Sequence, residues 1–272
     1  MEGMLAEDAV AVLRASEPAE KVALSRRLIE RWRAGGLQVG VGEPPPRPGR
    51  PERPELCPPR DMPKRRHFGS RAGQIALLHA LAHIELNAID LAWDIVARFA
   101  GPDLPREFAD DWAGVAAEEA EHFALLAARL QALGAAYGDL PAHDGLWEAA
   151  AATAHDLLAR LAVVPLVLEA RGLDVTPAMI HRLERAGDAD SAAVLDRIYR
   201  DEIGHVAVGA KWFERLCRDA GVDPAATFQD RVSRYFKGAL KPPFNRAARD
   251  AAGFPAGYYE PFASARSCFT AA

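Results

Sequence analysis

The chain has 272 residues, of which 50% are hydrophobic and 26% are charged, and its formal net charge is −5. This composition is typical of a folded globular protein, and the length allows one large domain or one domain with substantial extensions. The negative net charge argues against broad, sequence-independent binding to nucleic acid or to an anionic membrane.

Three cysteines, Cys57, Cys217 and Cys268, are odd in number and lie far apart in the chain. They predict neither a disulfide framework nor a cysteine zinc site, and they favour a reducing compartment. The N-terminal residues are acidic where a signal peptide begins with basic ones, and there is no run of about 18 uncharged apolar residues of the kind that forms a membrane helix. We therefore expect a cytoplasmic protein.

The first part of the chain predicts a helical extension followed by a connector. Residues 6–35 have the pattern of one or two short helices, interrupted at Ser16-Glu17-Pro18 and ended by Gly35-Gly36. Residues 43–63 contain nine of the 20 prolines. Because proline lacks an amide hydrogen and has a fixed φ, this segment is expected to be extended. We expect an N-terminal extension over 1–42 and a proline-rich linker over 43–66, which lies on the protein's own surface.

The central part is rich in alanine and leucine and predicts a four-helix bundle over 67–222. The long helices are expected at 73–100, 106–133, 146–172 and 188–219. Thr176-Pro177 predicts the start of a short extra helix between the third and the fourth. The connection over 134–145 is long enough to cross the length of the bundle only when it is extended. The fold class is therefore expected to be all-α.

Residues 223–272 predict a helix followed by an irregular arm packed on the bundle. The helix is expected to begin at Pro224 and to end near Phe236. The arm contains four aromatic residues, which either pack on the bundle or cover an access route to a site in it, and packing is the favoured interpretation. They are Phe244, Phe254, Tyr258 and Tyr259.

Acidic residues and histidines interrupt the apolar seams of the predicted helices near their middles. At the seven-residue spacing that keeps residues on one face, the seams are apolar except at these positions, and the seam of the third helix is less regular than the other three. Burying an ionised carboxylate without a partner costs on the order of several kcal/mol of folding free energy. The seams carry no lysine or arginine near these positions, whereas two divalent cations would balance four carboxylates. The six predicted metal ligands are Glu85, Glu119, His122, Glu169, Glu202 and His205.

The spacing of these residues supports the same hypothesis. Glu119-x-x-His122 and Glu202-x-x-His205 each place a carboxylate and an imidazole one helical turn apart. Glu85 precedes Glu119 by 34 residues and Glu169 precedes Glu202 by 33, so the two halves look like a repeat. Two details qualify this pattern. Glu118 is an alternative to Glu119, and Pro165 predicts a kink just before Glu169.

Four further residues near this set have weaker predictions. Tyr199 and Asp201 are candidates for hydrogen bonding around the ligands, and ordinary packing is the favoured role for Tyr199. His79 and His83 are four residues apart and could form a separate metal site, which we disfavour because both turn away from Glu85.

The motifs resemble those of the ferritin-like superfamily of di-iron or di-manganese carboxylate proteins. More narrowly, HALAHIELNAIDLAWD, AEEAEHFALL, VLEARGLD, RDEIGHVAVGAKWF and KPPFNRAARDAAGF are similar to an uncharacterised bacterial group within it, described as a domain of unknown function. The resemblance covers about 65–260. It implies that Glu85 and Glu169 are ligands from single-glutamate helices, that Glu119 and Glu202 are bridging carboxylates, and that the histidines of the two motifs are terminal ligands.

The resemblance and the donor set imply a non-haem dimetal oxidoreductase that uses dioxygen or peroxide, such as a di-iron oxidase or monooxygenase. Iron is favoured, with manganese or zinc as alternatives. The substrate would be a small molecule or a modified macromolecule, and the protein a monomer or homodimer. Two other functions stay open, namely metal storage or detoxification and a metal-free helical interaction module.

Overall fold

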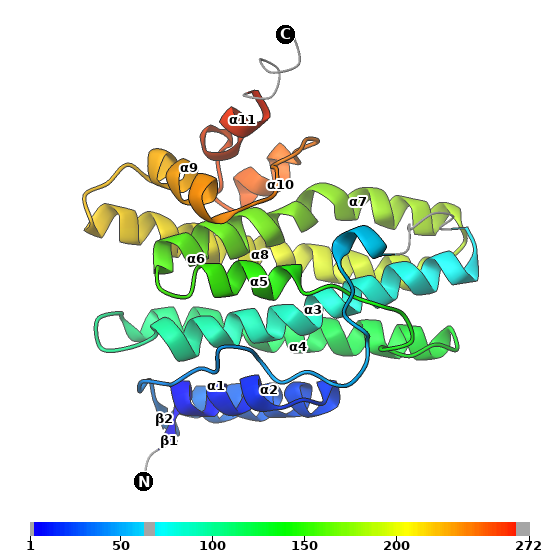
Figure 1. Ribbon diagram of the computed structural model, residues 1–272, viewed down its shortest axis with the longest axis horizontal. Coiled ribbons are helices and arrows are strands. Elements are labelled where there is room, and N and C mark those ends of the chain that lie inside the picture. Colours follow the sequence, from blue (N-terminus) through cyan, green and yellow to red (C-terminus); the bar gives the residue numbers. More distant parts are fainter. Residues whose placement is uncertain (1–2, 63–68, 265–272) are drawn as a thin grey trace. The chain divides into compact units, whose positions relative to one another are not determined.

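The computed structural model describes residues 3–62 and 69–264 (Figure 1). Their secondary structure is almost entirely helical, which confirms the all-α class. The chain divides into two compact units, Met1–Glu148 with His181–Val194, and Ala149–Ile180 with Leu195–Ala272. The predicted boundaries at 42, 66 and 222 stay predictions, and the one at 66 lies outside the described residues.

The first unit begins with two helices that belong to its core. Strand β1 (Gly3–Met4) pairs in parallel with β2 (Leu37–Gln38), and the helices α1 (Leu5–Arg14) and α2 (Pro18–Arg33) lie between these strands in the chain. Helix α1 packs on α3 and α2 packs on α4. The N-terminal segment therefore covers these two helices, and its apolar face is buried.

Helices α3 (Arg71–Phe99) and α4 (Arg106–Ala132) lie side by side in this unit (Figure 1). Their bounds agree with the prediction to within two residues. The hydroxyl of Ser70 accepts a hydrogen bond from the amide of Gly73 and caps the start of α3. The short connection between the two helices makes them antiparallel, so positions near the middle of α3 lie opposite the middle of α4.

The connection over 134–145 runs along α3. The amides of Gly138 and Leu140 donate to Nε2 of His79, at 2.9 and 3.4 Å. Four residues further along α3, His83 contacts Tyr137 and His143 of the same connection. These contacts fix the path that the chain takes to helix α5 (Gly145–Ala152).

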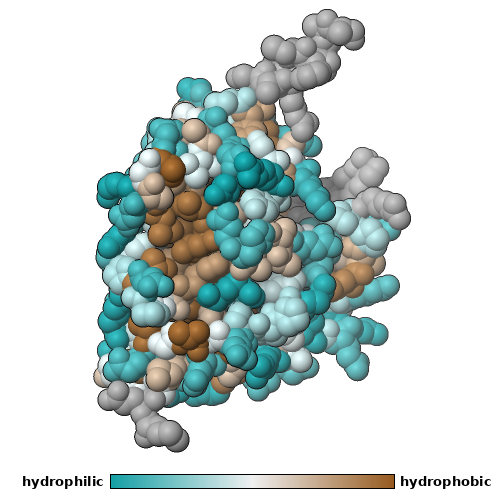
Figure 2. Space-filling model, turned by 60° about the vertical axis from the view of Figure 1, so that its left-hand side comes forward, coloured by the Kyte–Doolittle hydropathy of each residue, from teal (hydrophilic) through white to brown (hydrophobic). Residues whose placement is uncertain are grey.

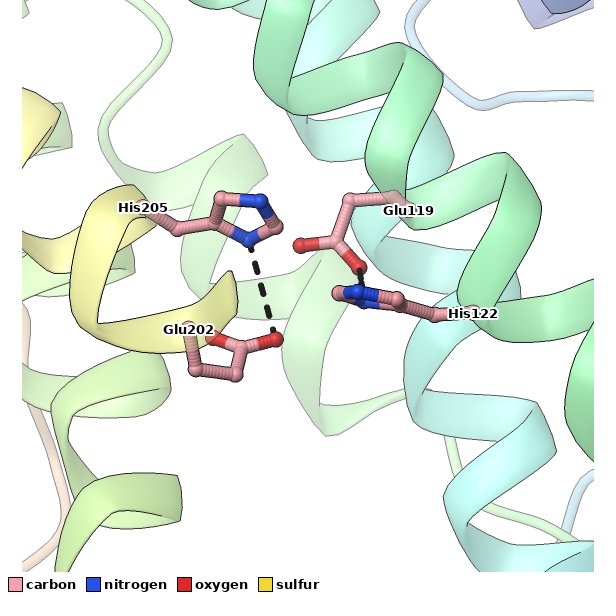
Figure 3. Close-up of side chains that lie close together, drawn as sticks. All are labelled: Glu119, His122, Glu202 and His205. Atoms are coloured by element: carbon pink, nitrogen blue, oxygen red, sulfur yellow. Dashed lines mark hydrogen bonds and ion pairs between the residues drawn. The ribbon is translucent and has the colours of Figure 1, made fainter. Parts of the chain in front are cut away.

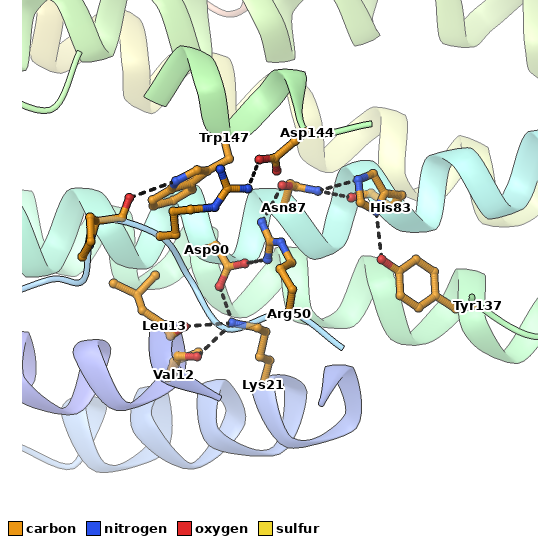
Figure 4. A network of polar contacts seen from close by, with 12 residues as sticks. Val12, Leu13, Lys21, Arg50, His83, Asn87, Asp90, Tyr137, Asp144 and Trp147 are labelled. Atoms are coloured by element: carbon orange, nitrogen blue, oxygen red, sulfur yellow. Dashed lines mark hydrogen bonds and ion pairs between the residues drawn. The ribbon is translucent and has the colours of Figure 1, made fainter. Parts of the chain in front are cut away.

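A buried polar network joins the proline-rich segment and α2 to α3 (Figure 4). Lys21 of α2 is fully buried and donates to the carboxylate of Asp90 at 2.6 Å and to the carbonyl of Val12 at 3.1 Å. Arg50 contacts the other oxygen of Asp90 and donates to Asn87 at 2.6 Å. Burial lowers the pKa of Lys21 and raises the pKa of Asp90. The charge of Asp90 partly restores the pKa of Lys21, and the charge of Lys21 partly restores the pKa of Asp90.

The prediction of one helix over 146–172 is wrong. The chain forms α5, then α6 (Leu157–Val163), then a π-helix η2 (Val164–Glu169) and the start of α7 (Ala170–Arg185). Asp156 begins a new helix by capping the amide of Ala159. Pro165 has no amide hydrogen to donate, and the backbone changes from α to π geometry there, where the sequence predicted a kink.

The short extra helix predicted to begin at Thr176-Pro177 is also wrong, because Pro177 lies inside α7. A proline within a helix removes one backbone hydrogen bond. Burial of Leu173 and Leu183, on either side of the proline along α7, offsets this loss.

The second unit combines α6, η2 and most of α8 (Ala189–Asp219), which matches the predicted 188–219, with the C-terminal segment. Helix α9 (Pro224–Tyr235) begins at the predicted residue and packs on α6 and on α11 (Ala256–Ser264). The short α10 (Arg246–Ala251) precedes α11. Aromatic rings of the C-terminal segment form a cluster in which the ring centroids of Phe254 and Tyr258 lie 5.3 and 5.5 Å from that of Phe228.

Among the described residues, α3 alone is long and apolar enough to cross a membrane, and 72% of its most apolar window is buried inside the structure. This burial is the pattern of a core helix in a water-soluble protein, and the cytoplasmic location stays a prediction. Figure 2 shows hydrophobic side chains gathered in one area of the visible face, bordered by hydrophilic ones.

Candidate metal centre

The first half of the candidate site lies between α3 and α4. Glu85, Glu119 and His122 are 4%, 0% and 1% exposed, at the positions that the seam pattern predicted to face inward. Nδ1 of His122 lies 3.3 Å from a carboxylate oxygen of Glu119, one turn earlier on α4, and 3.6 Å from one of Glu85 on α3. Two carboxylates from antiparallel helices therefore converge on one imidazole.

The two carboxylates change the acid–base behaviour of His122. Burial alone lowers the pKa of the imidazole, but hydrogen bonds and charge interactions with Glu119 and Glu85 outweigh it and raise the pKa to about 11. His122 is therefore protonated at neutral pH when no metal ion is bound, and its proton partly balances the buried carboxylates. A metal ion that bound here would displace this proton, because only neutral imidazole ligates.

The second half of the candidate site lies on α8. Nδ1 of His205 is 3.7 Å from a carboxylate oxygen of Glu202, one turn earlier. His205 is buried, and 13% of the Glu202 side chain is exposed. The pair repeats the arrangement of Glu119 and His122 on α4, as the matching motifs predict.

Glu169 is the last residue of the π-helix η2 rather than part of a long α-helix. Its position depends on how closely η2 approaches α8, and this approach is tight, because a β-carbon built on Gly209 would lie 2.5 Å from Cβ of Pro165. Pro165 is four residues before Glu169, and Gly209 is four residues after His205. Residue 209 therefore has room for glycine but not for a residue with a β-carbon, unless the neighbouring atoms shift.

Four of the six predicted ligands form a buried cluster of a kind that can hold a metal ion. One ligand atom from each of Glu119, His122, Glu202 and His205 lies within 4.8 Å of the others. Figure 3 draws these side chains, with the ion pair of each Glu-x-x-His motif as a dashed line. Glu85 and Glu169 are not members of this group of four.

The alternative ligand Glu118 has a different environment from Glu119. The side chain of Glu118 is exposed, whereas Glu119 is fully buried. Burial is what makes a counter-charge necessary, so the structure favours Glu119 as the ligand. The assignment of all six ligands stays a prediction.

His79 and His83 use their ring nitrogens elsewhere. His79 accepts hydrogen bonds from backbone amides of the connection, as described above. The hydroxyl of Tyr137 lies 2.8 Å from Nδ1 of His83, and the carbonyl of His143 lies 3.0 Å from its Nε2. A carbonyl can only accept, so Nε2 donates to it. Burial lowers the pKa of His83 to about 4, so the ring is neutral at pH 7 and Nδ1 accepts a hydrogen bond from the hydroxyl of Tyr137.

The two residues proposed to assist the ligands have ordinary partners. The hydroxyl of Tyr199 accepts a hydrogen bond from the side-chain amide of Asn245 at 3.0 Å, which links α8 to the C-terminal arm. Asp201 accepts from Nε of Arg197 at 2.6 Å, one turn earlier on α8. Their roles around the ligands stay predictions.

Two buried polar features were not predicted from the sequence. One is the network of Lys21, Arg50, Asn87 and Asp90. The sequence pattern that could have indicated it is the presence of Asn87 and Asp90 within an otherwise apolar run of α3. The other is Arg249, which is 2% exposed in the C-terminal arm. The irregular sequence around Arg249 gives no periodicity from which its burial could have been predicted.

The cluster offers carboxylate oxygens and imidazole nitrogens, and such donors bind several divalent metal ions. Burial lowers the local dielectric constant and strengthens the interactions of these groups with cations. The four residues can therefore hold a metal ion.

The fold and the site define a helical protein with a buried glutamate and histidine cluster. Residues 14–260 match the family model described as "Protein of unknown function (DUF455)", and the chain belongs to this family. It is also 45% identical over 214 residues to an uncharacterized protein of Haemophilus influenzae, an alignment that covers 75% of this chain and 72% of the relative. No solved structure matches the chain.

Proposed function

We propose that this protein is a ferritin-like, non-haem dimetal carboxylate oxidoreductase. Its centre would hold two iron or manganese ions on Glu85, Glu119, His122, Glu169, Glu202 and His205. The observation that carries the proposal is the buried cluster of four of these ligands, two from each Glu-x-x-His motif. In this proposal the protein acts in the cytoplasm, as a monomer or homodimer, on a small molecule or a modified macromolecule.

Electrostatics supports a pair of cations rather than a metal-free core. The six proposed ligands include four carboxylates, and carboxylates placed close together disfavour one another's ionised form. Two divalent cations would make the centre neutral, with both imidazoles as nitrogen ligands.

The chain's own residues would prepare the centre for binding and for redox chemistry. Glu119 and Glu85 both face Nδ1 of His122, at 3.3 and 3.6 Å, and would help to fix the orientation of its ring. Metal ions bound there would supply electrons to dioxygen or peroxide. Buried apolar residues of the same seams, such as Ala82 and Trp112, would limit the access of bulk water to the cluster.

The test is anaerobic loading of the purified chain with iron(II), followed by metal analysis and exposure to air. We expect about two iron ions per chain and oxygen consumption on exposure. Glu119→Gln should lower the metal content, whereas Glu118→Gln, which changes the neighbouring exposed carboxylate, should retain it. Equal iron content in both variants, or iron that does not oxidise in air, would contradict the proposal.

A further inference from the structure

The second unit contains a cavity of about 200 Å³ between α7 and the segment that follows α9. Part of its wall is apolar and includes Leu168, Leu240 and Phe244. The rest carries charged side chains, namely Arg171, Asp174, Lys241 and Arg249. A cavity with an apolar wall and a few converging polar groups is the usual form of a small-molecule site.

Arg249 is the buried charge of this cavity. Its Nε and Nη2 donate to the two carboxylate oxygens of Asp174, at 2.9 and 2.8 Å, and Nη2 lies 3.3 Å from the carbonyl of Ala170. The ring of Tyr259 stacks 4.4 Å from the guanidinium carbon, so the group is held rigidly. Nη1 is buried and has no hydrogen-bond partner among the described residues. A guanidinium donates five hydrogen bonds, so donors of Arg249 remain for a ligand.

The charges around the cavity favour an anion. Arg171, Lys241 and Arg249 carry three positive charges, and Asp174 supplies one negative charge to balance them. Arg171 also donates to the carbonyls of Lys241 and Pro243, at 2.8 and 3.2 Å, which holds this segment against α7. The cationic side of the cavity is therefore built into the fold and does not depend on a loop taking up a new position.

We propose that this cavity binds a small organic anion. A carboxylate or phosphate would accept hydrogen bonds from Nη1 of Arg249 and from the ammonium group of Lys241, and the apolar body of the molecule would lie against Leu168 and Phe244. Pockets for drug-sized ligands measure roughly 300–1,000 Å³, so this cavity suits a smaller molecule or one end of a larger one. The binding requires no metal ion and is independent of the dimetal proposal, although Val167 and Leu168 directly precede Glu169.

The experiment titrates the full, metal-free chain with benzoate, phenyl phosphate and benzyl alcohol, with ligand-observed NMR and calorimetry as readouts. The three probes share a ring and differ in the charged group. At least one anion should bind about tenfold or more tightly than the alcohol, as expected for a charge-assisted hydrogen bond. The stronger of benzoate and phenyl phosphate identifies the headgroup. Equal binding of all three probes, or binding of none, would overturn the proposal.

Two variants locate the binding. Lys241→Gln should weaken binding of the anion up to about fivefold, which is the range for an exposed ion pair. Lys237 is an exposed lysine outside the cavity wall, so Lys237→Gln should leave the affinity for the anion unchanged. Arg249→Lys keeps the charge and loses the planar fork, and it should weaken binding about tenfold or more. Thermal unfolding checks that Arg249→Lys folds; if it does not, the Lys241 and Lys237 pair decides. Anion binding unchanged in Lys241→Gln would contradict the proposed location.

Discussion

Gly209 of α8 faces Pro165 of η2 so closely that a β-carbon at residue 209 would lie 2.5 Å from Cβ of the proline. Neither neighbour can give way easily, because the proline ring is rigid and α8 is a long helix. This contact fixes the distance between the helix that carries Glu202 and His205 and the π-helix that ends at Glu169.

Gly209→Ala is therefore expected to destabilise the protein by about 1–3 kcal/mol, as overpacking does in other cores. Gly204→Ala on the same helix is the matched control, because a β-carbon there has no described neighbour within 4 Å. The control should gain up to about 1 kcal/mol from higher helix propensity. Urea denaturation of both variants measures the difference, and a Gly209→Ala variant as stable as the control would contradict the contact.

Lys21→Met is expected to lower the free energy of unfolding by about 2–4 kcal/mol, because it removes one of the two cations that flank the buried Asp90. Arg50 keeps the carboxylate partly compensated, so the loss should stay below that of a fully unpaired charge. Lys237→Met, at an exposed lysine, is the control and should change stability by less than about 0.5 kcal/mol. Equal stability of the two variants would show that Lys21 does not support the network.

Acidification is expected to destabilise the metal-free protein through His83. Its pKa is about 4 in the folded state and near 6.5 unfolded, so the unfolded chain takes up the proton first. The neutral ring contributes fully to stability above pH 6.5, and this contribution of up to about 3 kcal/mol is lost as the pH falls from 6.5 to 4. His83→Gln should flatten this part of the stability curve, whereas His181→Gln, at an exposed histidine, should not. A curve with the same slope in all three proteins would contradict the assignment.

Manganese(II) binding is expected to raise the melting temperature. At a free metal concentration of 100 times Kd, the gain is about 2.7 kcal/mol, which corresponds to roughly 5–10 °C for a chain of this size. His122→Gln and His205→Gln should each reduce the shift, and His181→Gln serves as the control. Addition of EDTA should reverse the shift in the unmodified protein. A shift that survives both substitutions would place the metal elsewhere.

The helices that the sequence predicted well have ends marked by local signals. Helix α3 starts at a serine cap, and α4 follows a short connection with glycine and proline. The third predicted helix failed because Asp156 starts a new helix inside an alanine-rich run and Pro165 shifts the backbone into a π-helix. Hydrophobic periodicity predicts a continuous helix here, and it does not show that a cap or a proline will interrupt that helix.

The candidate site depended on a different kind of signal. Carboxylates on apolar seams, with a repeated spacing, pointed to Glu119 and His205 without knowledge of the fold, because charge inside an apolar seam is costly wherever the helix lies. Contacts between distant segments had no such signal. The pairing of Lys21 with Asp90 joins residues that are 69 positions apart, and the sequence around Lys21 is typical of an exposed helix.

The packing of α1 and α2 on α3 and α4 limits how the chain can be shortened. A fragment that began at residue 67 would lack α1 and α2, including the buried residues Leu13 and Leu28, so the sides of α3 and α4 on which these helices pack would be exposed. It would also lack both cations that contact Asp90. The shortened protein would expose an apolar surface and would be prone to aggregation. The proline-rich linker and the two helices before it should therefore be kept in any preparation meant for crystals or assays.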